Sequence, residues 1–252
     1  TGNTCGENSI GIYLYSSSNN TLTGNTCNSN WAGILLESSN NNILTGNTYD
    51  SNSEFGIYLY ESDNNTFTGN TANENSNYGI YLELSSDNTL TGNTCNLNSY
   101  GIRLCSSSNN NTLTGNTANE NSNYGICLYS SSNNTIYLNN LSNNTNAYVE
   151  ESPGNIWNSP TPIYYDYTSG SFHKNYLGNY YGNYTGSDED GDGIGTDPYN
   201  GTGMTDNYPL MTTSDHYSLQ AWWLNSDSKM YKDDRSKTID SVAIGGGSSH
   251  IW

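Results

Sequence analysis

Short alternating runs of apolar and polar residues recur along the chain from Thr1 to Asn144, at intervals of 22 or 23 residues. One run carries the phrase Gly-Ile-x-Leu, first seen at Gly11, and the other carries Thr-Leu-Thr-Gly-Asn-Thr, first complete at Thr21. Each run is too short for a helix of about ten residues, and Asn, Ser and Gly separate the runs. The pattern therefore predicts two short strands and their turns in every repeat, and a fixed period of this length is typical of a solenoid.

Aligning the repeats places apolar residues in three columns. In a stacked solenoid, equivalent residues lie about 4.8 Å apart, so each column is predicted to form a continuous apolar stack inside the coils. The columns are Leu22, Leu44, Phe67, Leu90, Leu113 and Ile136; Ile12, Ile34, Ile57, Ile80, Ile102 and Ile126; and Leu14, Leu36, Leu59, Leu82, Leu104 and Leu128.

Three further columns consist only of asparagine. An amide both donates and accepts hydrogen bonds, so a stack of identical Asn side chains is expected to bond from one coil to the next. A polar row that binds a ligand is the alternative, but the repetition favours architecture. The columns are Asn3, Asn25, Asn47, Asn70, Asn93, Asn116 and Asn139; Asn8, Asn30, Asn52, Asn75, Asn98, Asn121 and Asn144; and Asn20, Asn42, Asn65, Asn88, Asn111 and Asn134.

These patterns predict an all-β fold, a right-handed single-stranded parallel β-helix of about seven coils of 22 or 23 residues. The β-helix repeats are expected over residues 1–158. Residues 159–211, which are crowded with tyrosine, are expected to form an aromatic cap with an Asp-rich loop. Residues 212–252 are a β-rich tail, either an assembly segment or the beginning of a further domain.

Charge excludes some partners. The 252 residues hold 24 Asp and Glu against 6 Lys and Arg, a net charge of −18. Such a chain is not expected to bind nucleic acid, which requires neutralisation of phosphates, and anionic membranes would repel it. The sequence contains no apolar run of about 18 residues, so membrane insertion is not expected.

An extracellular or cell-surface location fits this composition. Sequons for N-glycosylation would suit the turns of a secreted solenoid. They begin at Asn19, Asn64, Asn110, Asn133, Asn140, Asn143, Asn183 and Asn200.

Five cysteines occur without a Cys-x-x-Cys pair. Cys5, Cys27 and Cys95 share a column with small or aromatic residues, which favours free thiols that act as small buried hydrophobes. Since Cys5 and Cys27 would lie on adjacent coils, a bridge between them is the alternative.

Tyrosines fill many outward positions of the Gly-Ile-x-Leu strands. A row of tyrosines on a flat sheet is a candidate surface for sugar rings or for a neighbouring molecule, and the alternative is ring stacking that only stiffens the sheet. Glu37 and Glu83 share a column two coils apart without an acid–base partner, so catalysis is not expected. The candidate binding surface is Tyr13, Tyr15, Tyr58, Tyr60, Tyr81 and Tyr129.

The candidate metal site is an acidic loop. Asp188, Asp190 and Asp192 alternate and Gly193 follows them, as in the first half of an EF-hand-type loop. The loop is predicted to bind Ca²⁺ in a structural role, and a solvated acidic loop is the alternative. The candidate ligands are Asp188, Asp190, Asp192, Ile194 through its carbonyl, Asp197 and Asp206.

Three motifs resemble the C-terminal signature of NosD-like β-helix proteins. They are Asn175-Tyr-Leu-Gly-Asn-Tyr-Tyr-Gly-Asn-Tyr184, the Asp-Gly-Asp-Gly-Ile-Gly core of 186–199, and Asp206-Asn-Tyr-Pro-Leu210. The resemblance covers residues 1–211 and implies a right-handed β-helix of a type abundant on archaeal, especially methanogen, cell surfaces. The chain departs from the family at Tyr181, where Trp is usual, and at Thr196-Asp197-Pro198, where Asp-Thr-Pro is usual.

The resemblance also brings the family's label of periplasmic copper binding. His173, His216 and His250 are scattered and Met is scarce, so the residues themselves predict no copper site.

The sequence thus favours a non-enzymatic structural protein of an archaeal cell surface that self-associates head-to-tail or laterally into a filament, sheath or surface layer. The first repeat begins at Thr1 without a capping segment, and the tail ends in strand-like Ser241-Val-Ala-Ile, so both are expected to contact other subunits or further chain. The alternatives are a carbohydrate-binding or adhesion module that binds glycans and, with less support, a polysaccharide lyase or hydrolase.

Overall fold

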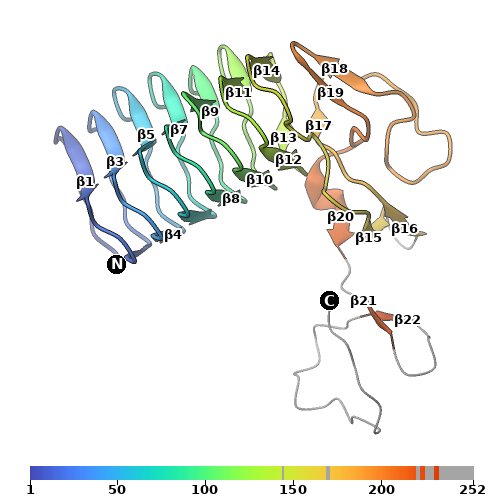
Figure 1. Ribbon diagram of the computed structural model, residues 1–252, viewed down its shortest axis with the longest axis horizontal. Helices are drawn as coiled ribbons and strands as arrows, with labels where there is room; N and C mark the ends of the chain where they lie inside the picture. The colour runs from blue at the N-terminus through green and yellow to red at the C-terminus, as the bar shows by residue number, and fades with distance from the viewer. Residues whose placement is uncertain (144, 169–170, 220–221, 225–229, 233–252) are drawn as a thin grey trace, which may run out of the picture.

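The computed structural model describes residues 1–143, 145–168, 171–219, 222–224 and 230–232. Over these residues the protein is a parallel β-solenoid whose coils stack side by side from the N-terminus, followed by a cap at the far end (Figure 1). The predicted all-β parallel β-helix is confirmed. No helix among the described residues has the length and apolarity needed to cross a membrane.

Two parallel sheets run along the solenoid. The larger sheet contains the Gly-Ile-x-Leu strands, in the order β1 Ile10–Tyr15, β3 Ala32–Glu37, β5 Phe55–Tyr60, β7 Tyr78–Glu83, β9 Tyr100–Cys105, β11 Tyr124–Tyr129 and β14 Ala147–Glu150. The smaller sheet contains the Thr-Leu-Thr strands, β2 Thr21–Thr23, β4 Ile43–Thr45, β6 Thr66–Thr68, β8 Thr89–Thr91, β10 Thr112–Thr114 and β12 Thr135–Tyr137. Six coils thus contribute to both sheets, and β14 begins a seventh.

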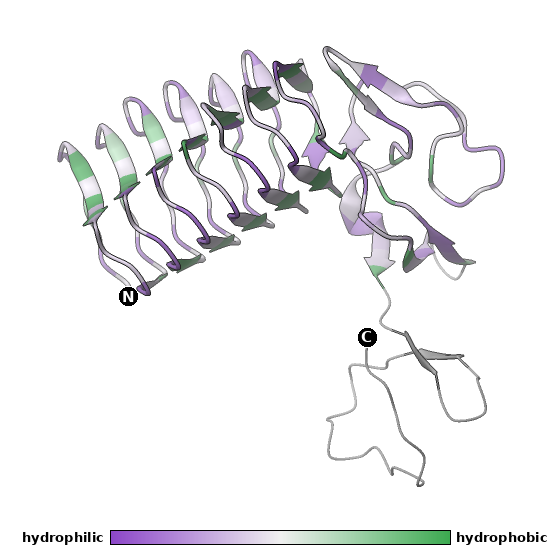
Figure 2. Ribbon diagram, viewed as in Figure 1, coloured by the Kyte–Doolittle hydropathy of each residue, from purple (hydrophilic) through white to green (hydrophobic). Residues whose placement is uncertain are grey.

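A third row of pairing consists of single bridges from Thr4 through Thr26 and onward to Asn140. It continues into the cap, where β13 Asn140–Leu141 pairs with β17 Tyr180–Tyr181. Figure 2 shows that the hydrophobic residues of the solenoid lie mainly on its strands, whereas strands of the cap such as β18 are hydrophilic.

The apolar columns form the core as predicted. Leu36, Ile57, Phe67, Leu90 and their equivalents in the other inner coils are fully buried. The strands pair in register, for example Ile57 with Ile80 and Leu59 with Leu82, so like side chains lie over like side chains. All five cysteines are free thiols, and four of them are buried.

The glycine of Gly-Ile-x-Leu is required by the close approach of neighbouring coils. A Cβ on Gly56 would lie 2.7 Å from the Cβ of Ala72 and 2.7 Å from the carbonyl oxygen of Gly79. The glycine of Thr-Gly-Asn-Thr has a different role, since Gly24 and its equivalents turn the chain with φ near +62°. The backbone therefore requires glycine in both repeated phrases.

The asparagine columns form hydrogen-bonded ladders. Oδ1 of Asn93, for example, accepts two hydrogen bonds from Asn70, one from its backbone N–H at 2.9 Å and one from its side-chain Nδ2 at 3.0 Å. The Nδ2 of Asn93 donates in turn to the carbonyl of Phe67 and to Oδ1 of Asn116, both at 3.0 Å. Every polar atom of this fully buried side chain is satisfied, and the same pattern recurs from coil to coil.

A fourth ladder, which the sequence interpretation missed, consists of serine. The backbone N–H of each serine donates to the hydroxyl of the next, from Ser17 to Ser39 at 2.9 Å and from Ser39 to Ser62 at 3.0 Å. It continues through Ser85, Ser108 and Ser131 to Ser152. Five of the seven serines lie in Ser-Ser runs of the turns, whereas Ser62 and Ser152 have no serine neighbour in the sequence.

Antiparallel pairs form the cap. In one sheet β15 Ile163–Tyr167 lies between β16 Ser171–Asn175 and β20 Tyr217–Leu219. β18 Tyr199–Gly201 pairs with β19 Met204–Asp206, η1 Ser214–His216 precedes β20, and β21 Trp222–Leu224 pairs with β22 Met230–Lys232. The predicted tail thus begins within the sheet of the cap, and its strand-like residues 241–244 lie outside the described residues.

The first asparagine ladder ends on a buried carboxylate. Asn139 donates to Asn179 at 2.9 Å, and Asn179 donates its backbone N–H to Oδ2 of Asp206 at 2.8 Å. Tyr181 and the backbone of Tyr208 donate to the same carboxylate at 3.1 and 2.9 Å. Because each residue of the ladder donates towards the C-terminus, a group that only accepts is the fitting end of the row.

Removing one amide from the middle of the ladder should destabilise the protein strongly. Asn93→Ala would leave the backbone N–H of Asn70 without its acceptor, and it would remove one hydrogen bond each from Nδ2 of Asn70, Oδ1 of Asn116 and the carbonyl of Phe67. Buried unsatisfied groups cost about 1–3 kcal/mol each, so we expect a loss of about 3 kcal/mol or more in the free energy of unfolding. Urea titration measures it, and the exposed Asn207→Ala is the control. Equal stability of the two variants would contradict the role of the ladder.

The stability should fall as the pH rises from about 4 to about 7. Burial raises the pKa of Asp206 from 3.8 to about 6, although its backbone and side-chain donors oppose that rise. Between these two pKa values the native state therefore binds a proton that the unfolded chain has already lost. The contribution of this proton to the free energy of unfolding, roughly 3 kcal/mol, is fully present below pH 3.8 and is lost as the pH rises through about 6.

The melting temperature between pH 4 and pH 7 tests this linkage. Asp206→Asn should flatten the pH dependence, whereas the exposed Glu120→Gln should leave it as it is in the wild type. An unchanged slope in the Asp206 variant would refute the assignment.

Candidate functional site

The outward face of the larger sheet carries the predicted tyrosines. Tyr13, Tyr58 and Tyr81 occupy one column, and Tyr15, Tyr60 and Tyr129 occupy the column two residues further along each strand. Tyr15, Tyr13 and Tyr129 are 60%, 47% and 39% exposed, and the other three are half-buried. The structure therefore brings the six predicted residues onto one surface of the solenoid.

A ladder of rings beside these columns was missed from the sequence. Its four central rings lie at the first position of strands β5, β7, β9 and β11, Trp31 lies one residue before β3, and Tyr148 lies in the column of Tyr58 and Tyr81. Its centroid separations are 5.1, 5.2, 5.3, 5.9 and 5.0 Å, and it consists of Trp31, Phe55, Tyr78, Tyr100, Tyr124 and Tyr148. The aromatic residue that directly precedes Gly56, Gly79, Gly101 and Gly125 was the signal in the sequence. We call these six residues the aromatic ladder.

The aromatic ladder joins the predicted tyrosines into one network. Phe55 stacks on Tyr58 and Tyr78 stacks on Tyr81, each with centroids 4.7 Å apart, and Tyr58 lies 5.2 Å from Tyr81. Aromatic pairs at such separations add about 0.5–1.5 kcal/mol each to the burial of the rings. The rings in the centre of the face are therefore held in fixed positions.

Carboxylates accept hydrogen bonds from the phenols on this face. Tyr58 donates to Glu83 at 2.8 Å, and Tyr13 donates to Glu37. The bond to Glu37 raises the pKa of Tyr13 to about 12, and burial together with Glu83 raises that of Tyr58 further. These phenols are neutral at physiological pH and present uncharged rings.

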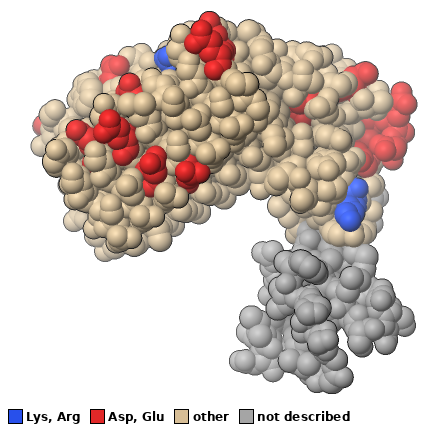
Figure 3. Space-filling model, in the orientation of Figure 1, with Lys and Arg blue, Asp and Glu red and all other residues tan. Residues whose placement is uncertain are grey.

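One guanidinium lies among the rings. Arg103 is 5.2 Å from the ring centre of Tyr100 and 5.6 Å from that of Tyr78, and it donates to the hydroxyl of Tyr78 at 3.0 Å. The thiol of Cys105 donates to the hydroxyl of Tyr81 at 3.0 Å. Nearly all other charge on the molecule is acidic, as Figure 3 shows for the face in view.

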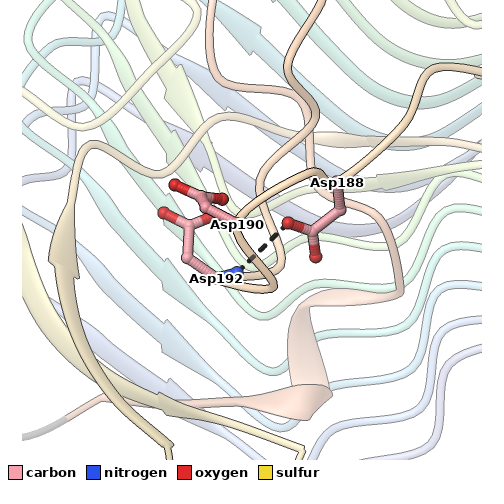
Figure 4. A group of neighbouring side chains, drawn as sticks. All are labelled: Asp188, Asp190 and Asp192. Atoms are coloured by element: carbon pink, nitrogen blue, oxygen red, sulfur yellow. Dashed lines mark hydrogen bonds between the residues drawn. The ribbon is translucent and has the colours of Figure 1, made fainter.

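The structure brings three of the six predicted metal ligands together. Single carboxylate oxygens of Asp188, Asp190 and Asp192 lie within 4.8 Å of one another (Figure 4). Asp188 accepts the backbone N–H groups of Gly191, Asp192 and Gly193 at 2.8, 3.1 and 2.9 Å, which holds the loop in shape.

Two of the other three predicted ligands, Asp197 and Asp206, do not belong to this group of carboxylates. Ile194 is buried and donates its N–H to Asp192. The carbonyl of Asp197 accepts the hydroxyl of Tyr184 at 2.6 Å, and Asp206 ends the asparagine ladder. Ile194 thus adjoins the three carboxylates through its N–H, and its carbonyl stays a predicted ligand.

These donors do not suit copper. Within the described part of the chain, the three aspartates are the one group of three or more His, Cys, Asp or Glu ligands close enough to share an ion. His173 packs on Tyr165, His216 is an exposed neighbour of Asp215, and His250 lies outside the described residues. Copper prefers imidazole and sulfur ligands, whereas three carboxylates suit a hard cation such as Ca²⁺.

The predicted glycosylation residues lie mainly at exposed turns. Asn19, Asn64, Asn110 and Asn133 share one left-handed turn position, with φ between 56° and 62°. Asn143, Asn183 and Asn200 are exposed as well. Asn140 is half-buried and accepts the backbone N–H of Ser214 at 2.8 Å, so it is the least accessible of the eight.

Solved structures with a similar fold include enzymes that modify polysaccharides. The periplasmic alginate epimerase AlgG superposes with a TM-score of 0.53 at 22% identity over 58% of this chain and 46% of its own, in a T265N mutant. The A-module of the Azotobacter vinelandii mannuronan C-5 epimerase AlgE4 superposes with a TM-score of 0.55 at 17% identity, over 60% of this chain and 51% of its own. This chain spans about half the length of these structures, and the likeness shows the fold.

No curated protein sequence matches the chain. The profile of the family described as periplasmic copper-binding protein (NosD) matches residues 1–186 of the 252, which include every coil of the solenoid and the first motif of the cap. The chain therefore belongs to the NosD family of parallel β-helix proteins.

Proposed function

We propose that this protein is an exported glycan-binding protein that holds a polysaccharide against the tyrosine face of its larger sheet. The observation that carries the proposal is the aromatic ladder, a continuous row of six rings bordered by the exposed phenols of Tyr13, Tyr15 and Tyr129. Rings held in place by their neighbours lose little conformational entropy when a sugar ring stacks on them.

Two further features support glycan binding. The phenol hydroxyls and the carboxylates of Glu37 and Glu83 alternate along the face, so hydroxyl groups of a sugar would meet both donors and acceptors. The structures that share the fold include epimerases named for alginate and mannuronan, both of which are polysaccharides. The description of the NosD family as periplasmic fits an exported protein.

We propose binding without turnover. Glu37 and Glu83 lie two coils apart and each accepts a hydrogen bond from a tyrosine, so neither is paired with the other as general acid and base. Phenols with raised pKa are poor bases at neutral pH.

Removing two central rings should weaken glycan binding. Affinity electrophoresis through gels that contain soluble polysaccharides measures it, and we expect Tyr58→Ala with Tyr81→Ala to lower the affinity about tenfold or more, because two stacking contacts are lost. Tyr58→Phe with Tyr81→Phe is the matched control and should retain most of the affinity.

Two outcomes would overturn the proposal. Wild-type protein that binds none of the polysaccharides in the gels would contradict glycan binding. Turnover of an acidic polysaccharide would show that the protein is an enzyme and would contradict binding without turnover.

We also propose that the loop of Asp188, Asp190 and Asp192 binds Ca²⁺ and stabilises the cap. The three carboxylates converge, and Asn175 donates to Oδ2 of Asp192 at 2.8 Å, so the loop is linked to strand β16. A cation would relieve the mutual repulsion of the three carboxylates.

Chelation should lower the melting temperature. With Ca²⁺ at about 100 times Kd, binding stabilises by about 2.7 kcal/mol, or about 5–10 °C for a chain of this size. Asp190→Ala removes a ligand oxygen from a side chain that has no hydrogen bond to a described residue, so it should abolish the effect of Ca²⁺ without changing the melting temperature in chelator. If the wild-type protein has the same melting temperature with and without chelator, the loop is acidic but does not bind Ca²⁺, and the proposal is wrong.

A structural function is the second candidate. Four hydrogen-bonded ladders that run through the coils make a stiff rod, which would suit a filament, sheath or surface layer outside an archaeal cell. Ordered fibres or sheets of purified protein in electron micrographs, rather than dispersed particles, would favour this function over a soluble binding module.

A further inference from the structure

A shallow, open groove of about 800 Å³ lies along one corner of the solenoid over the first four coils. It lies where the chain enters strands β1, β3, β5 and β7, and its lining consists of serine, asparagine and glutamate side chains around Trp31. Neither the tyrosine face nor the acidic loop includes this groove.

Trp31 supplies the apolar contact in the groove. Its side chain is 40% exposed, and the buried ring of Phe55 supports it edge-on with centroids 5.1 Å apart. Trp31 is also the first ring of the aromatic ladder, so the groove joins the proposed glycan-binding face at this residue. A supported, exposed indole is a platform on which the C–H face of a sugar can stack.

Free polar groups surround this platform. The carboxylates of Glu7 and Glu74 and the exposed hydroxyls of Ser29 and Ser51 make no hydrogen bond to any residue in the described part of the chain. The asparagines of the lining are different, because the amide of Asn30 is occupied by the ladder. The groove thus presents unoccupied acceptors and hydroxyls around a supported indole, and such groups suit the hydroxyl groups of a sugar.

Charge and length define the ligand. The lining contains two carboxylates and no Lys or Arg, so a chain of uronic acids would be repelled. Glu7 and Glu74 are three coils apart, about 14 Å at the spacing of neighbouring strands, which is long enough for several sugar units.

We infer that this groove binds an uncharged oligosaccharide, stacked on Trp31 and hydrogen-bonded to Glu7 and Glu74. The inference rests on the proposed glycan-binding function and adds to it the class of ligand and a second contact surface. A single neutral polysaccharide would then contact both the tyrosine face and the groove.

Titration calorimetry with oligosaccharides of known composition tests the inference. The probes are neutral oligomers from cellulose, laminarin, mannan and xylan, with oligomannuronate and oligogalacturonate of equal length for comparison. We expect at least one neutral oligomer to bind at least tenfold more tightly than either uronate. Uronates that bind as tightly as every neutral oligomer would overturn the assigned ligand class.

Variants then locate the ligand. Trp31→Ala should weaken binding of the neutral oligomer at least tenfold, and Trp31→Phe, which keeps a ring and guards against a folding defect, should retain most of it. Phe172→Ala removes an exposed aromatic residue from the cap and should have no effect. Glu7→Gln with Glu74→Gln should narrow the preference for neutral over uronate oligomers.

The outcomes separate this inference from the proposed function. Binding that survives Trp31→Ala but is lost in the Tyr58 and Tyr81 double variant would refute the groove and leave the tyrosine face as the site. A wild-type protein that binds none of the probes and no polysaccharide of the electrophoresis panel would refute both.

Discussion

Buried side-chain amides require hydrogen-bond partners, and this requirement holds the whole structure in register. Asn70, Asn93 and Asn116 have almost no contact with solvent, yet each amide is satisfied by the equivalent residue of the next coil and by a carbonyl of the preceding one. A shift of one residue would leave every member of a column unpaired, at about 1–3 kcal/mol for each group. The apolar columns alone would tolerate such a shift more readily, since Leu, Ile and Phe pack without directional bonds.

Register in the interior determines what the surface can present. Because strands β5, β7 and β9 pair residue for residue, an aromatic side chain at one outward position is followed by another about 5 Å away. The aromatic ladder is therefore a consequence of the same repetition that builds the asparagine ladders. Trp31 begins this row at the groove, so the two proposed sugar-contacting surfaces share one structural origin.

Repetition also explains how much of the fold could be predicted. The strand at Thr89–Thr91, its buried Leu90 and the amide ladder at Asn93 follow from period and residue type, because each position is defined several times over. Asp206 illustrates what could not be predicted. Its sequence neighbourhood suggests a metal ligand, but its place at the end of a ladder depends on how the cap folds back onto the last coil, which no repeat encodes.

The candidate site was predictable only in part. The alternation of Asp188, Asp190 and Asp192 located a group of converging carboxylates, and the outward tyrosines located the face. The ring at Tyr78 was missed because it directly precedes a strand glycine and so lies outside the Gly-Ile-x-Leu phrase, although it stacks on the rings of Phe55 and Tyr100. The groove at Trp31 involves residues of four coils and a single tryptophan, so no column of the sequence contains it.

Hydrogen exchange of the ladder amides, followed by NMR in the native state, tests the central claim most directly. If the ladders hold the coils in register, the backbone and side-chain N–H groups of Asn70, Asn93 and Asn116 should exchange only through global unfolding, with the same free energy as denaturant titration gives. Exchange of these groups at the rate of exposed asparagines would contradict the account.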